Sequence, residues 1–178
     1  MSYYIEGNGV HLRVKKDYCL FAFSSLAVIL LDQLSKLVVA NSIRYHGSIP
    51  VIDGFFNLVH VRNRGMAFGL MNRSYTGFLF FLLVASTIAA IILIVYWLSR
   101  LKVDERRLGL GLSLILGGAI GNLIDRLRFK EVIDFLDFFI GAYHWPAFNL
   151  ADSSITVGAI WVIINIFFFG SHDGRKNK

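Results

Sequence analysis

Residues 74–99 read SYTGFLFFLLVASTIAAIILIVYWLS, a stretch of 26 residues without a charged side chain. A helix that spans the hydrocarbon core of a bilayer needs about 20 mostly apolar residues, with every backbone polar group paired inside the segment. This stretch is long enough, and it therefore predicts a transmembrane helix.

Three more apolar runs lie on either side of this stretch. We expect four spanning helices, at about residues 18–40, 75–98, 108–126 and 150–170. The first run resembles a cleaved signal peptide in its position. It is longer than such a peptide, carries Asp32 and Lys36, and lacks a clear small-residue cleavage site, so we interpret it as a permanent span.

The composition agrees with a membrane protein. Of 178 residues, 56% are hydrophobic and only 17% are charged, against about 25% in an ordinary soluble domain. The mean hydropathy is +0.60, which excludes a disordered chain and argues against a soluble globule. The single cysteine, Cys19, excludes an internal disulfide and a cysteine-based zinc site. The length predicts one membrane-embedded domain over residues 1–178.

Lysines and arginines in the connections predict the orientation. The two tails and the 99–107 connection hold 10 basic residues in 34, whereas the loops 41–74 and 127–149 hold 6 in 57. Cytoplasmic connections are the richer in Lys and Arg, so we expect both termini in the cytoplasm and the two long loops outside. The basic residues are dispersed without a basic–aromatic pattern, so we expect no nucleic-acid partner.

The outer loop 41–74 holds a turn at 50–54 followed by residues 55–61, which are rich in β-formers. The predicted fold class is therefore an all-α integral membrane protein of four transmembrane helices, with a small extracytoplasmic β-sheet in the loop between the first two. The aromatic residues of loop 127–149 suit the membrane interface.

Charged residues in or beside the spans all fall near the outer surface in this topology. They are Asp32, Lys36, Asp125, Arg126, Asp134 and Asp152. Ionisable groups in a bilayer cost roughly 2.5–3.5 kcal/mol each on insertion scales, so each suggests a function. Their convergence at one depth favours a site at the outer interface over an ion path through the membrane.

Structural explanations compete with functional ones at these positions. Asp32 and Lys36, four residues apart, can neutralise each other or contact a substrate. Asn149 and Asp152 form a helix-capping pattern. The small residues repeating every fourth position in 113–121 indicate close helix packing. Arg126 can extend its side chain to the interface, or belong with Asn122 and Asp125 to a network that holds substrate backbone.

Two carboxylates that approach closely cannot both ionise easily, so one keeps a proton while the other acts as a base. Asp152 with Asp134 could form such an aspartic-protease pair, with Asp137 as an alternative to Asp134. The sequence contains no H-E-x-x-H and no G-x-S-x-G motif, which argues against a zinc protease and a serine hydrolase.

Five blocks, in order, resemble the bacterial lipoprotein signal peptidase (signal peptidase II) family. They are D-x-x-x-K at 32–36, N-x-G-x-A-F at 63–68, G-G-x-x-G-N-x-x-D-R at 117–126, V-x-D-F at 132–135 and F-N-x-A-D-S at 148–153. Each block alone is a weak signal, but five in order on a four-span chain are a specific one.

The resemblance implies an intramembrane aspartyl endopeptidase that cleaves prolipoproteins before their diacylglyceryl-modified cysteine. It implies no metal or organic cofactor, the bacterial inner membrane as the location, membrane lipids as neighbours, and inhibition by globomycin-like cyclic peptides. By motif match, the implied catalytic pair is Asp134 and Asp152, which selects Asp134 over Asp137. The implied substrate-binding residues are Asn63, Asn122, Arg126 and Asn149, and the implied supporting residues are Asp32, Lys36, Gly65 and Asp125.

A non-enzymatic transporter or lipid-binding protein is the alternative function. It would use the Asp32–Lys36 and Asp125–Arg126 pairs, and it predicts charges along a pore and internal symmetry. The sequence shows neither feature.

Overall fold

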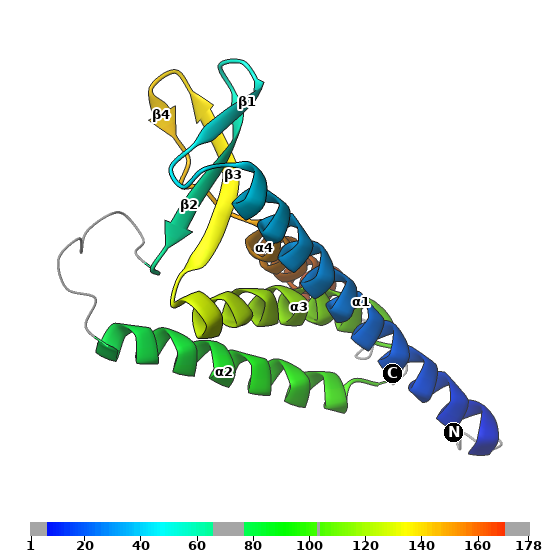
Figure 1. Ribbon diagram of the computed structural model, residues 1–178. Coiled ribbons are helices and arrows are strands. Elements are labelled where there is room, and N and C mark those ends of the chain that lie inside the picture. Colours follow the sequence, from blue (N-terminus) through cyan, green and yellow to red (C-terminus); the bar gives the residue numbers. More distant parts are fainter. Residues whose placement is uncertain (1–6, 66–76, 103, 170–178) are drawn as a thin grey trace.

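The computed structural model describes residues 7–65, 77–102 and 104–169 of the chain (Figure 1). The elements, in chain order, are α1 Gly7–Ser42, β1 Ser48–Ile52, β2 Phe56–Asn63, α2 Gly77–Arg100, α3 Arg106–Phe129, β3 Val132–Ile140, β4 Tyr143–His144, α4 Leu150–Ile164 and a π-helical turn, η2, Asn165–Phe169.

Four helical segments are long and apolar enough to cross a membrane, as the sequence predicts. They are Asp17–Ser42, Phe80–Arg100, Arg106–Phe129 and Leu150–Phe168. The helix α1 begins at Gly7 and so extends well before the expected start at residue 18. The second segment begins later than expected, and the predicted residues 75, 76 and 170 lie outside the described part of the chain.

Helix α3 packs against each of the other three helices. Each of the four helices contributes one buried side chain to a common core. These are Phe21, Leu98, Leu112 and Val162. Small residues let the backbones approach, because a Cβ at Gly117 would lie 2.8 Å from the Ser25 carbonyl oxygen of α1, and one at Gly118 would overlap the Ala151 carbonyl oxygen of α4. The predicted close packing along this stripe is confirmed.

An antiparallel sheet in the order β1-β2-β3-β4 lies at one end of the helices (Figure 1). The strand expected at residues 55–61, in the loop between the first two spans, is present as β2. The sheet extends beyond that loop, so the expected location covers only part of it and the all-α label is incomplete. Half of its strands come from residues 132–144. The strand β3 escapes prediction because its first four residues are all buried, so it lacks the alternation of a half-exposed strand.

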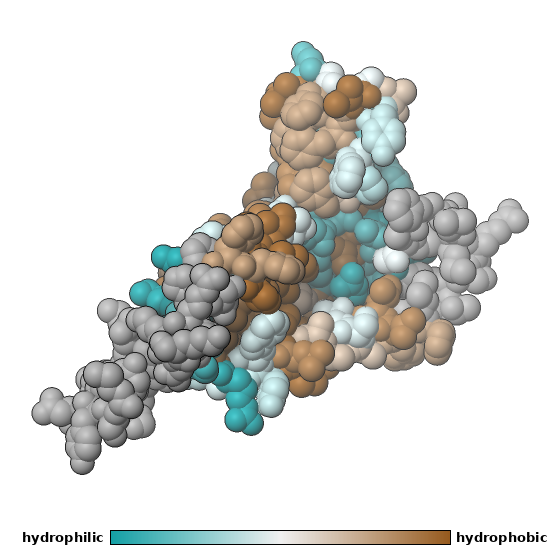
Figure 2. Space-filling model, turned by 180° about the vertical axis from the view of Figure 1, so that it is seen from behind, coloured by the Kyte–Doolittle hydropathy of each residue, from teal (hydrophilic) through white to brown (hydrophobic). Residues whose placement is uncertain are grey.

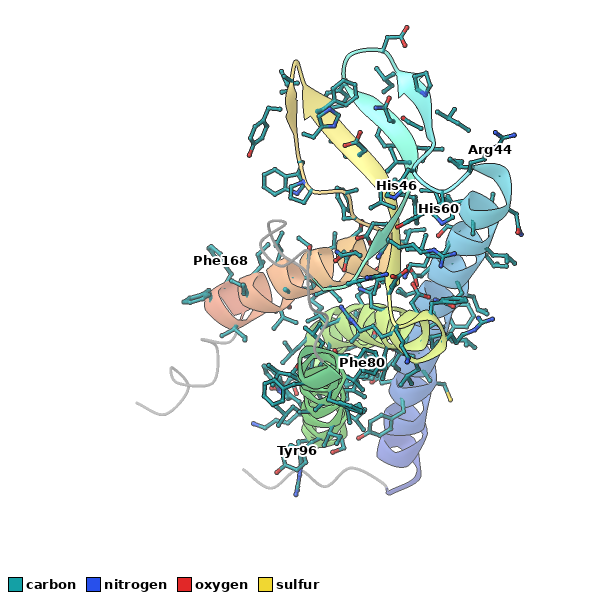
Figure 3. All side chains as sticks on the ribbon, turned by 60° about the vertical axis from the view of Figure 1, so that its left-hand side comes forward. Arg44, His46, His60, Phe80, Tyr96 and Phe168 are labelled. Atoms are coloured by element: carbon teal, nitrogen blue, oxygen red, sulfur yellow. The ribbon has the colours of Figure 1, made fainter. Side chains whose placement is uncertain are left out.

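The sheet is fixed to the end of α1. His60 of β2 is buried, and its Nδ1 lies 2.9 Å from the backbone oxygen of Ile43, so this nitrogen carries the hydrogen (Figure 3). Val39 and Ile43 also pack on Phe135 of β3. These contacts hold β2 and β3 directly over the helix ends.

The outer faces of the helices expose large apolar side chains. Phe23, Phe81 and Phe167 are 69%, 68% and 73% exposed, which suits contact with lipid. Hydrophilic residues instead collect in a recess between the sheet and the helices (Figure 2). The molecule therefore has a polar centre at the junction of its two parts.

Candidate active site

Asp134 and Asp152 meet at this junction, from two different elements. Asp134 is the third residue of β3 and is 2% exposed, and Asp152 lies in the first turn of α4. Asn149 joins them. Its side-chain Nδ2 donates to Oδ1 of Asp134 at 2.7 Å, and its backbone N donates to Oδ2 of Asp152 at 3.3 Å.

Asn149 takes this position because it caps α4. Its Oδ1 accepts the backbone N–H of Asp152 at 2.9 Å, and together with the return bond this makes a capping box. The predicted helix cap is therefore confirmed. The same side chain caps the beginning of α4 and bonds to the carboxylate of Asp134.

Two more asparagines complete the set of donors. Asn63, the last residue of β2, donates to Oδ2 of Asp134 at 2.9 Å, and its own Oδ1 accepts the N–H of Gly65 at 2.8 Å. Gly65 has a φ of 83°, a left-handed conformation that favours glycine. Asn122 of α3 donates to Oδ1 of Asp152 at 2.7 Å. Every carboxylate oxygen of the pair thus has a donor.

Burial dominates the electrostatics of Asp134. It raises the pKa of this carboxyl to about 7, and the negative charge of Asp152 adds to the increase. The hydrogen bonds from Asn63 and Asn149 oppose the increase but do not outweigh it. Near neutral pH the pair is therefore able to hold one proton, which is the requirement for acid–base work by two carboxyls.

A buried polar cluster lies directly behind the pair. It consists of Asp32, Gln33 and Lys36 of α1 with Asp125 of α3. The Lys36 ammonium lies 2.8 Å from a carboxylate oxygen of both Asp32 and Asp125, and the three charged residues are 0–2% exposed. The Asp32–Lys36 pair does neutralise itself, as one explanation expected, and it also reaches a second helix.

This cluster also binds the backbone next to each aspartate of the pair. Asp32 accepts the N–H of Ala151 at 3.0 Å, one residue before Asp152. Asp125 accepts the N–H of Ile133 at 3.4 Å, one residue before Asp134. The four-residue cluster therefore positions both β3 and α4.

Sequence reasoning missed Gln33. Its Nε2 donates to Asp32 at 3.2 Å, to the Gly121 carbonyl oxygen at 3.2 Å and to Asp125 at 2.9 Å. An amide inside a predicted span needs a polar partner, and Gln33 directly follows Asp32, so the signal was present.

Nine of the ten predicted site residues lie in this one hydrogen-bonded assembly. The exception is Arg126, which is half-buried, and its side chain makes no hydrogen bond or ion pair with the described residues. Asp137 lies further along β3 and bonds to Asn57 at 3.2 Å and His144 at 2.9 Å. Residues 66–68 of the second sequence block lie outside the described part.

The fold and this polar centre are those of a membrane-embedded enzyme. Two solved structures titled as a bacterial membrane enzyme, determined in meso at 2.3 and 1.9 Å, match with TM-scores of 0.73 and 0.72 at 33% and 32% identity. The chain covers 94% and 93% of them, and the matches cover 89% and 84% of this chain.

The family model described as signal peptidase (SPase) II matches residues 24–168. The lipoprotein signal peptidase of Syntrophus aciditrophicus is 44% identical over 86% of this chain and 95% of its own length, and that of Desulforapulum autotrophicum is 50% identical over 81% and 89%. The chain belongs to the signal peptidase II family, and it is a multi-pass membrane peptidase.

Proposed function

We propose that this protein removes signal peptides from prolipoproteins by an aspartyl mechanism, cutting before a diacylglyceryl-modified cysteine. The observation that supports it best is the pairing of Asp134 and Asp152 on the two sides of Asn149. Two buried carboxyls with different surroundings provide an acid and a base in one site. Residues 1–178 act as a single membrane-embedded domain in this proposal.

The reaction needs one proton on the pair. The ionised Asp152 takes a proton from a water molecule, and the resulting hydroxyl adds to the scissile carbonyl carbon, whose oxygen takes the proton of Asp134. The tetrahedral intermediate then collapses as Asp152 gives its proton to the leaving nitrogen and Asp134 takes back the hydroxyl proton. The C–N bond breaks, water is consumed, and the pair again holds one proton.

Arg126 is the residue best suited to hold the substrate backbone. It is half-buried one residue after Asp125, and its guanidinium has five N–H donors for carbonyl oxygens. The asparagines Asn63, Asn122 and Asn149 shape the site by orienting the carboxyls. Burial of the two acyl chains in the surrounding lipid, at roughly 0.8 kcal/mol per CH₂ group, would select the lipid-modified substrate.

The same arrangement supports a proposed location. The site lies at the end of the helices that carries the sheet, and the basic residues concentrate in the tails and the 99–107 connection. We place the protein in the bacterial inner membrane with both termini in the cytoplasm and the site at the outer leaflet. Membrane lipids surround it there, and a globomycin-like cyclic peptide would inhibit it by occupying this site.

A gel-shift assay with a diacylglyceryl-modified prolipoprotein tests the proposal. Asp134→Asn and Asp152→Asn should each lower turnover by about 10³-fold or more, while substrate still binds. The matched control is Asp137→Asn, on the same strand, which should retain activity because Asp137 bonds to Asn57 and His144 instead of the pair.

Failure has two distinct forms. A folded wild-type protein that cleaves nothing would favour the transport or lipid-binding alternative. Activity in both Asp134→Asn and Asp152→Asn would leave the peptidase but exclude this pair as its catalytic residues.

A further inference from the structure

The side-chain amide of Asn122 lies between a buried cation and one member of the pair. Its Oδ1 accepts from Nζ of Lys36 at 3.0 Å, and its Nδ2 donates to Oδ1 of Asp152 at 2.7 Å. Lys36 is 2% and Asn122 4% exposed, so solvent does not replace either contact. The two bonds form a direct connection from Lys36 to Asp152.

The chemistry of Lys36 determines how this amide is turned. An ammonium group only donates, so the amide must present its oxygen to Lys36 and its nitrogen to Asp152. A second donor, Nδ2 of Asn149, reaches the same oxygen at 3.2 Å. An N–H donor aimed at a carboxylate stabilises its charged form.

We propose that Lys36 is a positioning residue that fixes the Asn122 amide and thereby keeps Asp152 as the charged member of the pair, leaving the proton on Asp134. This inference rests on the proposed function, because the distinction matters only if the pair carries out acid–base chemistry. It gives Asn122 a role in orienting a catalytic group.

The amide oxygens of the other two asparagines accept backbone N–H groups. Asn149 is fixed by the backbone N–H of Asp152, and Asn63 by the N–H of Gly65. The oxygen of Asn122 instead accepts from a charged side chain, that of Lys36. Lys36 therefore has a specific task at one carboxyl of the pair.

A direct effect of the lysine's charge is the competing explanation. That charge acts on Asp134 and lowers its pKa, which opposes a proton there. The ionisable groups around Lys36 are Asp32 and Asp125, each 2.8 Å from its nitrogen, and the pair itself faces this cluster. Two carboxylates offset one ammonium, so the cluster has a formal charge of −1. The hydrogen bond through Asn122 acts on Asp152 instead, so a variant that keeps the cluster charge constant separates the two effects.

The test keeps that cluster charge constant. Lys36→Met alone would leave two buried carboxylates without a cation and is expected to destabilise the protein. The double variant Lys36→Met/Asp32→Asn retains one carboxylate and the formal charge of −1. It leaves the Asn122 oxygen with only the longer contact from Asn149, so the donor to Asp152 is held less firmly.

We expect this double variant to lower kcat by about tenfold with KM unchanged. The acid side of its pH–rate profile should move to higher pH, because the charged pair loses part of its hydrogen bonding. Asn122→Leu should move the acid side in the same way. Adding Asn122→Leu to the double variant should give no further shift. The double variant and Asn122→Leu act on the same hydrogen bond.

Lys102→Met, in the connection between α2 and α3, is the matched control for loss of a lysine, and its profile should equal that of the wild type. An unmoved acid side in the double variant would overturn the inference. So would shifts that add independently in the triple variant.

Isotope-edited infrared spectra of Asp-labelled protein give a readout that does not need turnover. They follow conversion of carboxylate to carboxyl as pH falls, and the step lost in Asp152→Asn identifies Asp152. That step should occur at higher pH in the double variant, and an unchanged step would overturn the inference. If the wild type cleaves no prolipoprotein, the proposed function fails, and these spectra still decide the effect of Lys36.

Discussion

The side-chain nitrogen of Asn149 lies 2.7 Å from a carboxylate oxygen of Asp134, although the two residues belong to different elements of the fold. The same asparagine caps α4 by accepting the N–H of Asp152. The distance between the two aspartates is thus set by a helix cap, whose geometry is nearly the same in every helix that has one.

Asn149→Ala should therefore affect stability and activity together. Loss of the cap should cost about 1 kcal/mol of folding free energy. Loss of the Asp134 donor should misplace that carboxyl and lower kcat by about 100-fold. Thermal unfolding and turnover measured on the same preparation check both effects.

Asn57→Ala is the matched control for this variant. Asn57 lies on β2 like Asn63 but donates to Asp137, so its loss should leave turnover within about twofold of the wild type. Equal losses of activity in the two variants would show that the effect comes from the sheet as a whole.

The sequence predicts the four spans well because spanning helices have a strong composition signal. It predicts the strand that becomes β2 but neither β3 nor β4. Val132–Ile140 contains the aromatic residues expected at a membrane interface, and its buried start removes the alternation that identifies a strand. Without β3, the sequence does not predict that Asp134 lies near Asp152. The strand β3 and the capped start of α4 bring the two together.

The polar residues show the limit of prediction from spacing. The positions of Asp32, Lys36, Asp125 and Asn122 indicate polar faces on two helices but not that a single ammonium joins them. Gln33 was missed although it bonds to both buried aspartates. Such contacts depend on how α1 and α3 approach, and only the packed helices define that.

The rate of cleavage should fall as pH rises through about 7. Burial raises the pKa of Asp134 to about this value, and the pair loses its last proton there. Measured kcat should decline with the slope of a single deprotonation, and Asp137→Asn should show the same decline. A kcat that stays constant up to about pH 9 would contradict this assignment.

Folding stability should depend on pH with the same group. The pKa of Asp134 in the folded protein lies above its ordinary value, so its protonated form is favoured by folding. Its contribution is complete below about pH 4 and is lost as pH rises through about 7. The thermal unfolding midpoint should fall between about pH 5 and about pH 8, and it should fall more steeply in the wild type than in Asp134→Asn. Equal slopes would mean that Asp134 titrates normally.

Gly118→Ala tests whether the contact between α3 and α4 positions the site. An added Cβ would overlap the carbonyl oxygen of Ala151 and lie 2.8 Å from Cγ1 of Ile155. Overpacking of this kind costs about 1–3 kcal/mol, and the displaced backbone directly precedes Asp152. The unfolding midpoint and kcat should both fall, with KM for the prolipoprotein changing less.

Ala90→Val is the control for Gly118→Ala, because it enlarges an exposed residue of α2 that does not face the site. It should leave the unfolding midpoint and kcat close to those of the wild type, since the added methyl groups meet lipid instead of backbone. An effect equal to that of Gly118→Ala would mean that any increase in helix volume is harmful. If Gly118→Ala loses activity and Ala90→Val does not, catalysis depends on the distance between α3 and the capped end of α4.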